Sequence, residues 1–160
     1  YVESQGNTMS DSDLIKLYSA RILGLAADIP HLGRLSAPQG TARIRSPLCG
    51  STVTAHVRMD GDRIADFGQE VRACALGQAS AGVLGQAVIG ATRADLARGA
   101  AQLTAMLKDG GPVPDAPWQG LEVLIPARDY PNRHASIMLS WLAALEAIDA
   151  VDAQDQSASG

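Results

Sequence analysis

The sequence predicts an α+β fold with an N-terminal helix, a three-stranded antiparallel sheet and then about four helices packed on one face of that sheet. Three observations support this prediction. An amphipathic run opens the chain, three segments with alternating apolar and polar residues follow, and the C-terminal half repeats its apolar residues at helical spacing. A length of 160 residues suits one domain with a core of its own.

The N-terminal helix is predicted to begin near Asp11 or Ser12, because either side chain can cap a helix. Its apolar residues recur every three or four positions, at Leu14, Leu17, Tyr18, Ile22 and Leu25. Residues 1–11 are expected to be a disordered leader, a prediction that rests on the internal Met9. The segment 28–35 ends the helix, and we expect its His31 to be a solvent-exposed loop residue.

The sheet is predicted to consist of a first strand over 41–46 and a hairpin between Ser46 and Ser80. Along the hairpin's first strand, Val53, Ala55, Val57 and Met59 alternate with Thr52, Thr54, His56 and Arg58. Because Gly, Asn and Asp tolerate the positive φ of a tight turn, we expect the chain to reverse at Asp60-Gly61. His56 falls on the polar face, where we expect it to be exposed rather than a ligand.

The hairpin brings the only two cysteines of the chain, Cys49 and Cys74, to its open end. With the turn centred on Gly61, Cys49 lies opposite Ala73 and one residue from Cys74. Gly68 interrupts the alternation of the third strand and suggests a bulge, which could shift this register by one residue.

Two helices are predicted directly after the hairpin. The small-residue run 75–89 would be weak as an isolated helix, because each of its glycines costs roughly 1 kcal/mol relative to Ala. We therefore expect it to pack closely on the sheet. Thr92 caps the next helix with Asp95 at the third position, and 110–112 ends it.

The C-terminal part is predicted to hold a short helix before Pro126 and one long final helix. The final helix begins at Asn132 or His134 and ends near Ile148, and its apolar face is formed by Ile137, Trp141, Leu142, Leu145 and Ile148. Residues 150–160 have too little apolar content to pack and are expected to be a mobile tail. The single domain is thus predicted to span 12–149.

Composition excludes several classes of protein. The formal net charge is −4, and no clustered Lys and Arg residues are apparent, which argues against binding to nucleic acid. Two cysteines are too few for a secreted disulfide framework. No uncharged apolar run approaches the length of a membrane span. We therefore expect a cytoplasmic protein that binds neither nucleic acid nor membrane.

The two thiols allow two interpretations. They could be buried cysteines that pack as small hydrophobic residues. Alternatively, they could ligate a metal ion or cluster, because thiolates that converge at a hairpin end provide soft-metal ligands. Local sequence favours ligation, since Cys49 lies in Pro47-Leu48-Cys49-Gly50, where Gly permits close approach of a ligand. Cys74 directly precedes a helix, whose free amides and positive dipole end favour a thiolate.

These motifs resemble the NifU N-terminal-like family of iron–sulfur cluster assembly scaffolds, which includes the IscU and SufU classes. The family's first Cys lies in a Pro-x-Cys-Gly-Asp turn, which 47–51 resembles with Ser51 in place of Asp. Its second Cys begins a small-residue helix followed by an Ala-Ser pair, as Cys74 does. Its third Cys lies near a late helix start, where this chain has no thiol. Alignment on the His of that motif puts Ala135 at the third position, and alignment on the Pro puts Ser136 there.

The resemblance implies a non-enzymatic scaffold that binds iron, an iron–sulfur cluster or zinc through Cys49 and Cys74, with His134 as a third metal ligand. The implied cofactor is a transient 2Fe-2S cluster or zinc, and the implied partners are cysteine desulfurase and cluster-accepting proteins. Two alternatives stay open. One is a degenerate member without metal that only binds the assembly machinery, and the other is an enzyme with a Cys nucleophile and His134 as its base.

Overall fold

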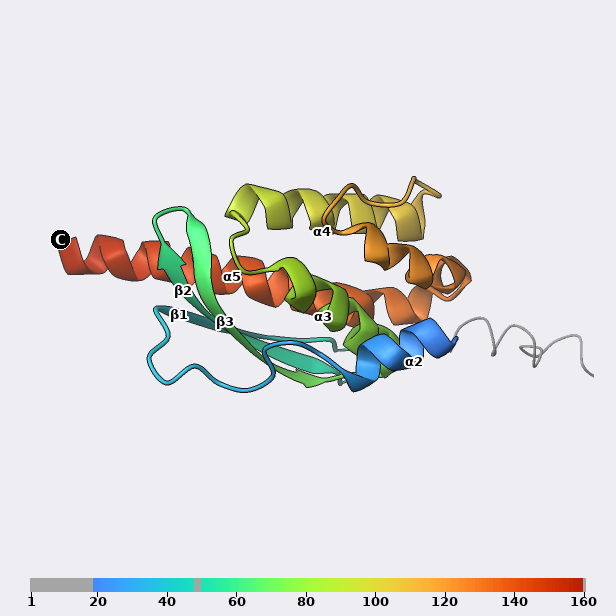
Figure 1. Cartoon of the computed structure of the whole chain (residues 1–160), viewed down its shortest axis with the longest axis horizontal. Helices are drawn as coiled ribbons and strands as arrows, with labels where there is room; N and C mark the ends of the chain where they lie inside the picture. The colour runs from blue at the N-terminus through green and yellow to red at the C-terminus, as the bar shows by residue number, and fades with distance from the viewer. Residues whose placement is uncertain (1–18, 48–49, 160) are drawn as a thin grey trace, which may run out of the picture.

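The computed structural model describes residues 19–47 and 50–159, with side chains described up to Val151 (Figure 1). The predicted leader, the predicted start of the first helix and Cys49 lie outside these residues. The elements are α2 (Ala20–Ala27), β1 (Gly40–Arg45), β2 (Thr52–Asp60), β3 (Arg63–Arg72), α3 (Ala75–Ala87), α4 (Arg93–Lys108), the 3₁₀ helices η1 (Gln119–Asp129) and η2 (Pro131–Arg133), and α5 (His134–Ser159). The predicted α+β class and element order are confirmed.

The sheet is antiparallel, with strand order β1-β2-β3. The predicted chain reversal is confirmed, but the turn has two residues, Gly61 and Asp62, since Asp60 pairs with Arg63. Gly61 has a φ of 64°, the conformation that a Gly tolerates without strain. The turn therefore starts the pairing one residue away from the predicted register.

A second irregularity lies within the hairpin, but not at Gly68 as predicted. Arg58 pairs with Asp66 whereas Met59 pairs with Ile64, so the register shifts there. Gly68 itself pairs regularly with His56. It is a Gly for another reason, because a Cβ at this position would lie 2.6 Å from the carbonyl oxygen of Gly33. Thr52 consequently pairs with Arg72 at the open end of the hairpin.

The segment between α2 and β1 covers part of the sheet's outer face (Figure 1). The backbone N–H of Gln69 donates to the carbonyl of His31 at 2.9 Å, and that of Gly33 donates to the carbonyl of Gln69 at 2.8 Å. His31 is exposed, as predicted. His56 is only 6% exposed, so the prediction of an exposed position is wrong. Its ring lies within hydrogen-bond distance of Thr41 on β1 and Glu70 on β3.

The inner face of the sheet packs on α5, which spans the length of the molecule in Figure 1. Ile137, Trp141 and Ile148 are buried as predicted, whereas Leu142 is 42% exposed and does not belong to the buried face. The helix also continues beyond its predicted end at Ile148, and Val151 is buried against β1. Helical structure therefore extends into the predicted tail.

The apolar character of α5 follows from its position in the core. Residues Pro131–Val151 are long and apolar enough to cross a membrane by composition, yet 61% of their most apolar window is buried inside the fold. Buried core helices share this composition. The apolar composition of this stretch is therefore that of the central, mostly buried helix of the domain.

Two tryptophans join α5 to α4 and η1. The rings of Trp118 and Trp141 meet edge to face, with 4.9 Å between their centroids. The indole N–H of Trp118 donates to the Asp95 carbonyl at 3.1 Å. A Cβ at Gly99 of α4 would lie 2.8 Å from carbon atoms of both rings. The absence of a side chain at Gly99 lets α4 approach this pair.

We predict that Gly99→Ala destabilises the domain by about 1–3 kcal/mol, because the added methyl overpacks the tryptophan pair. Gly24→Ala provides the control, since it makes the same change in α2 with no atom within 4 Å of the new Cβ. The control should stabilise by about 0.4–1 kcal/mol. Urea unfolding followed by tryptophan fluorescence measures both, and equal effects of the two variants would contradict the overpacking argument.

Candidate functional site

Cys74 lies at the junction of β3 and α3, where it is the N-cap residue of the helix. Its backbone is extended, and its side chain forms no capping hydrogen bond, so the thiol is not used to end the helix. The residue is half-buried. The structure thus confirms that Cys74 begins the small-residue helix, with its sulfur available for other contacts.

The nearest polar partner of Cys74 is Ser136 in the first turns of α5, with 3.6 Å between Sγ and Oγ. Gly77 makes this contact feasible, because a Cβ at that position would lie 2.7 Å from the Ser136 Oγ. The small-residue composition of α3 therefore has a direct consequence. It lets α3 and α5 pack closely enough for their first turns to meet.

A second hydroxyl completes this cluster. The Ser136 hydroxyl donates to the Ser51 Oγ at 3.4 Å, and both serines are buried, with exposures of 1% and 8%. Ser51 belongs to the turn before β2, so three segments far apart in the sequence converge on one point. They border a cavity of about 320 Å³ lined by Gly50, Ser51, Arg72, Ala73, Cys74, Asn132, Arg133 and Ser136.

The turn that precedes β2 is closed by backbone hydrogen bonds. The N–H of Ser46 donates to the Ser51 carbonyl at 2.8 Å, and the N–H of Gly50 donates to the Ser46 carbonyl at 2.9 Å. Gly50 has a φ of 72°, which explains the Gly after Cys49. Gly50 lines the cavity of Cys74. The distance between the two sulfurs stays a prediction, because Cys49 lies outside the described residues.

His134 and Ala135 lie elsewhere. The His134 ring is buried, and its Nε2 donates to the Ala127 carbonyl at 2.8 Å. Both residues border a different cavity, between β1, the end of α4 and α5, rather than the cavity of Cys74. The structure therefore places Ser136, not Ala135, next to Cys74. A ligand role for His134 stays a prediction that these contacts do not support.

The charged groups around the Cys74 cavity are cationic, namely Arg72 and Arg133. No carboxylate lines this cavity among the residues that the structure describes. Within the same residues, no three His, Cys, Asp or Glu side chains gather as a metal site. Sequence reasoning missed the two serine hydroxyls as neighbours of the thiol, although alignment on Pro131 had placed Ser136 at the relevant position.

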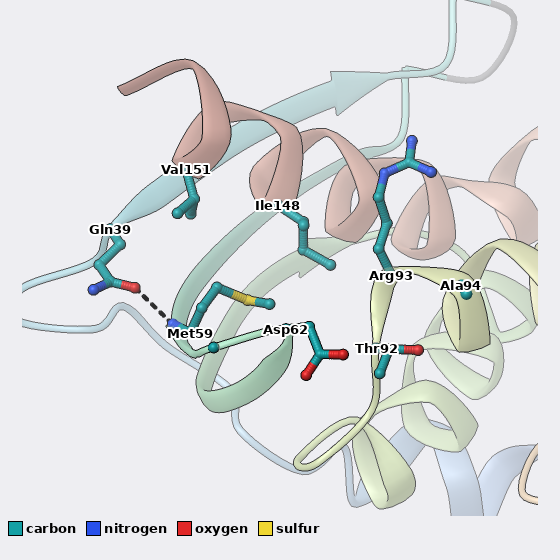
Figure 2. A pocket seen from close by; sticks show the side chains of 9 residues that line it. Gln39, Met59, Asp62, Thr92, Arg93, Ala94, Ile148 and Val151 are labelled. Carbon is teal, nitrogen blue, oxygen red and sulfur yellow. Dashed lines mark hydrogen bonds between the residues drawn. The ribbon is translucent and has the colours of Figure 1, made fainter. Parts of the chain in front are cut away.

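A larger cavity of about 620 Å³ lies at the other end of the hairpin (Figure 2). Figure 2 shows Met59, Ile148 and Val151 around it, with Asp62 and Thr92 at its side. The guanidinium of Arg93 donates two hydrogen bonds to the Asp149 carboxylate, at 2.7 and 3.1 Å. In the described part of the chain, no cysteine or histidine lines this cavity, so the Cys74 cavity is the better candidate for thiol or metal chemistry.

Comparison with known proteins gives concordant matches. A family model described as the NifU-like N-terminal domain matches residues 17–116. The iron–sulfur cluster assembly scaffold protein IscU of Streptococcus pyogenes serotype M1 is 28% identical over 141 residues, covering 88% of this chain and 87% of that protein.

Two solved structures share the fold. A nitrogen-fixing NifU-like protein (N-terminal) from Brucella abortus has a TM-score of 0.84 and 38% identity, with 88% of this chain and 97% of that chain covered. A putative iron–sulfur cluster assembly scaffold protein for the SUF system from Fervidobacterium islandicum AW-1 has a TM-score of 0.72 and 25% identity. The match covers 81% of this chain and 94% of that chain.

We predict that His134→Ala lowers the free energy of unfolding by about 1–3 kcal/mol, because it removes a buried ring together with one of the two hydrogen bonds to the Ala127 carbonyl, the other coming from the Tyr130 N–H. This effect exceeds the change of about 0.5 kcal/mol expected of a surface residue. Ser36→Ala, an exposed loop substitution, serves as the control. Chemical denaturation measures the difference, and a His134→Ala variant as stable as the control would contradict the structural role.

Proposed function

Because this chain belongs to the NifU-like N-terminal domain family, a family of iron–sulfur cluster assembly scaffolds, we propose that it binds iron, an iron–sulfur cluster or zinc through Cys49 and Cys74. The cluster is cargo in this proposal, held transiently and then passed on. The single observation that carries the proposal is the convergence of Cys74, Ser136 and Ser51 on one cavity beside Gly50, the residue after Cys49.

The geometry of this convergence suits a shared ion. The Cys74 Sγ and the Ser136 Oγ are 3.6 Å apart. A sulfur about 2.3 Å and an oxygen about 2.0 Å from one tetrahedral zinc ion would lie about 3.5 Å apart. The pocket therefore has nearly the donor spacing that ligation requires. Positive charge from Arg72 and Arg133 favours an anionic, thiolate-bound cargo.

The donor set is weaker than that of a scaffold with three cysteines. In this proposal Ser136 takes the place of the third thiol, and Ser51 takes that of the carboxylate in the family's first motif. A neutral hydroxyl is a poorer ligand than a thiolate or carboxylate for these metals. We therefore propose that the cargo is held through the two thiolates, with water or a serine hydroxyl completing the coordination.

The proposed partners are a cysteine desulfurase, which would supply sulfur, and cluster-accepting proteins, all in the cytoplasm. The enzyme alternative has less support, because Cys74 and His134 do not line the same cavity. A nucleophile and its base should lie within hydrogen-bond reach. A degenerate scaffold without metal remains the competing hypothesis, and it is the outcome that metal analysis can distinguish.

The first test is zinc binding by the reduced protein under anaerobic conditions, measured by competition with a chromophoric chelator. We expect one zinc ion per chain, with affinity lowered at least about tenfold by Cys49→Ser and by Cys74→Ser. Ser36→Ala should bind like the original chain. If neither cysteine variant changes the affinity, the proposed ligands are wrong, and if the original chain binds no zinc or iron, the degenerate scaffold is favoured.

The second test restores a thiol at the third position. Ser136→Cys should tighten zinc binding about tenfold or more, since its sulfur would lie beside Cys74. Ala135→Cys is the matched control, because Ala135 borders another cavity. Chelator competition under reducing conditions, with absorbance of a reconstituted cluster as a second readout, compares the two. A larger gain from Ala135→Cys would refute the assignment of Ser136 to the third position.

A further inference from the structure

Four exposed arginines gather on the outer face of the sheet, next to the candidate site. They are Arg34 from the segment before β1, Arg43 and Arg45 from β1, and Arg72 from β3. We refer to these four side chains as the arginine face. The sequence suggested no cluster of basic residues, and this inference is wrong, because strand pairing assembles the cluster from separate segments.

The pairing register fixes the layout of the arginine face. Arg45 pairs with Thr52, which pairs with Arg72, so two arginines flank one threonine across three strands. Arg43 occupies the next position on the same side of β1, because side chains alternate along a strand. Arg34, Arg43 and Arg72 border a shallow depression of about 220 Å³ whose floor includes Thr52 and Thr54. The hydroxyls and guanidinium groups provide hydrogen-bond donors.

Among the described residues, Glu70 is the only carboxylate that lines this depression, and it is already engaged. His56 Nε2 lies 3.1 Å from one of its oxygens, and Arg34 Nε lies 3.3 Å from the other. The hydrogen bond from His56, followed by that from Arg34, lowers the pKa of Glu70. In the part of the chain that the structure describes, Arg43, Arg45 and Arg72 form no ion pair.

Within the described residues, the charges of Arg43, Arg45 and Arg72 are unpaired, and such a cluster of like charges is unfavourable within an isolated sheet. It stands out more here because the chain as a whole carries a formal net charge of −4. The cations lie where an external anion can reach them. Guanidinium groups bind carboxylates and phosphates through paired hydrogen bonds, so the arginine face has the chemistry of an anion-binding surface.

We propose that the arginine face binds an acidic segment of a partner protein, whose Asp and Glu side chains pair with Arg43, Arg45 and Arg72. Alternate carboxylates of an extended segment are roughly 7 Å apart, the spacing between Arg43 and Arg45 along β1. No aromatic side chain from residues 19–47 or 50–151 lines the depression, and binding of single-stranded nucleic acids usually involves such stacking platforms. Arg72 also lines the Cys74 cavity. The bound segment therefore lies beside the candidate site.

This binding surface is independent of metal ligation by the thiols. The probe is a short fluorescein-labelled peptide in which Glu and Ser alternate, and the control peptide has Gln in place of each Glu. Fluorescence anisotropy at low salt should show binding of the Glu peptide only. The affinity should fall as salt is raised, since exposed ion pairs are screened.

The test variant is Arg43→Gln with Arg72→Gln, which should weaken peptide binding at least about tenfold. The matched control is Arg21→Gln with Arg98→Gln, which removes the same charge from exposed positions on α2 and α4. The control should bind like the original chain. Cys74→Ser should also keep its affinity, even if it loses zinc.

Three results would overturn the proposal. The first is no binding of the Glu peptide, or equal loss of binding in both double variants. The second is loss of peptide binding in Cys74→Ser with the arginines intact. The third is displacement of the labelled peptide by inorganic pyrophosphate or a single-stranded oligonucleotide at a lower concentration than unlabelled peptide requires. That result would identify the arginine face as a phosphate-binding surface.

Discussion

The close packing of α3 against α5 is the interaction on which the candidate site depends. Gly77 leaves no side chain between the helices, so the first turns of α3 and α5 meet. Further along, the buried Ser80 hydroxyl donates to the Ile137 carbonyl at 2.7 Å and accepts from the Trp141 indole N–H at 2.9 Å. Buried polar groups require such partners. These hydrogen bonds specify how the two helices align, and with them the separation of Cys74 from Ser136.

The hairpin supplies the second constraint on the site. Its two-residue turn and the register shift near Met59 together determine which residues meet at its open end. The result pairs Thr52 with Arg72, so that the turn containing Gly50 lies near Cys74. Because one residue of register inverts the faces of a strand, the same pairing also decides which arginines gather on the outer face. The geometry of the Cys74 cavity and the surface charge thus have a common origin.

The site combines a well-positioned thiol with neutral hydroxyl neighbours. Ser51 and Ser136 are buried and in mutual hydrogen-bond contact. The donors next to the thiol are therefore hydroxyl groups, which are poorer ligands for zinc and iron than thiolates or carboxylates.

Local physical rules made several parts of the fold predictable from the sequence alone. The turn at Gly61 follows from its positive φ, and the start of α4 follows from the capping box of Thr92 and Asp95, in which each side chain bonds the other residue's backbone. The small-residue run after Cys74 indicated a closely packed helix. These features depend on neighbours in sequence, so composition and spacing suffice to identify them.

Other features depend on segments far apart in the chain, and only the tertiary structure decided them. His56 is buried and hydrogen-bonded to Thr41 and Glu70 of the neighbouring strands. The continuation of α5 beyond Ile148 is accompanied by packing of Val151 against β1. The contact of Cys74 with Ser136 rather than Ala135 depends on how α5 is rotated against α3. Sequence spacing does not encode that rotation, because it arises from side-chain packing across the whole helix interface.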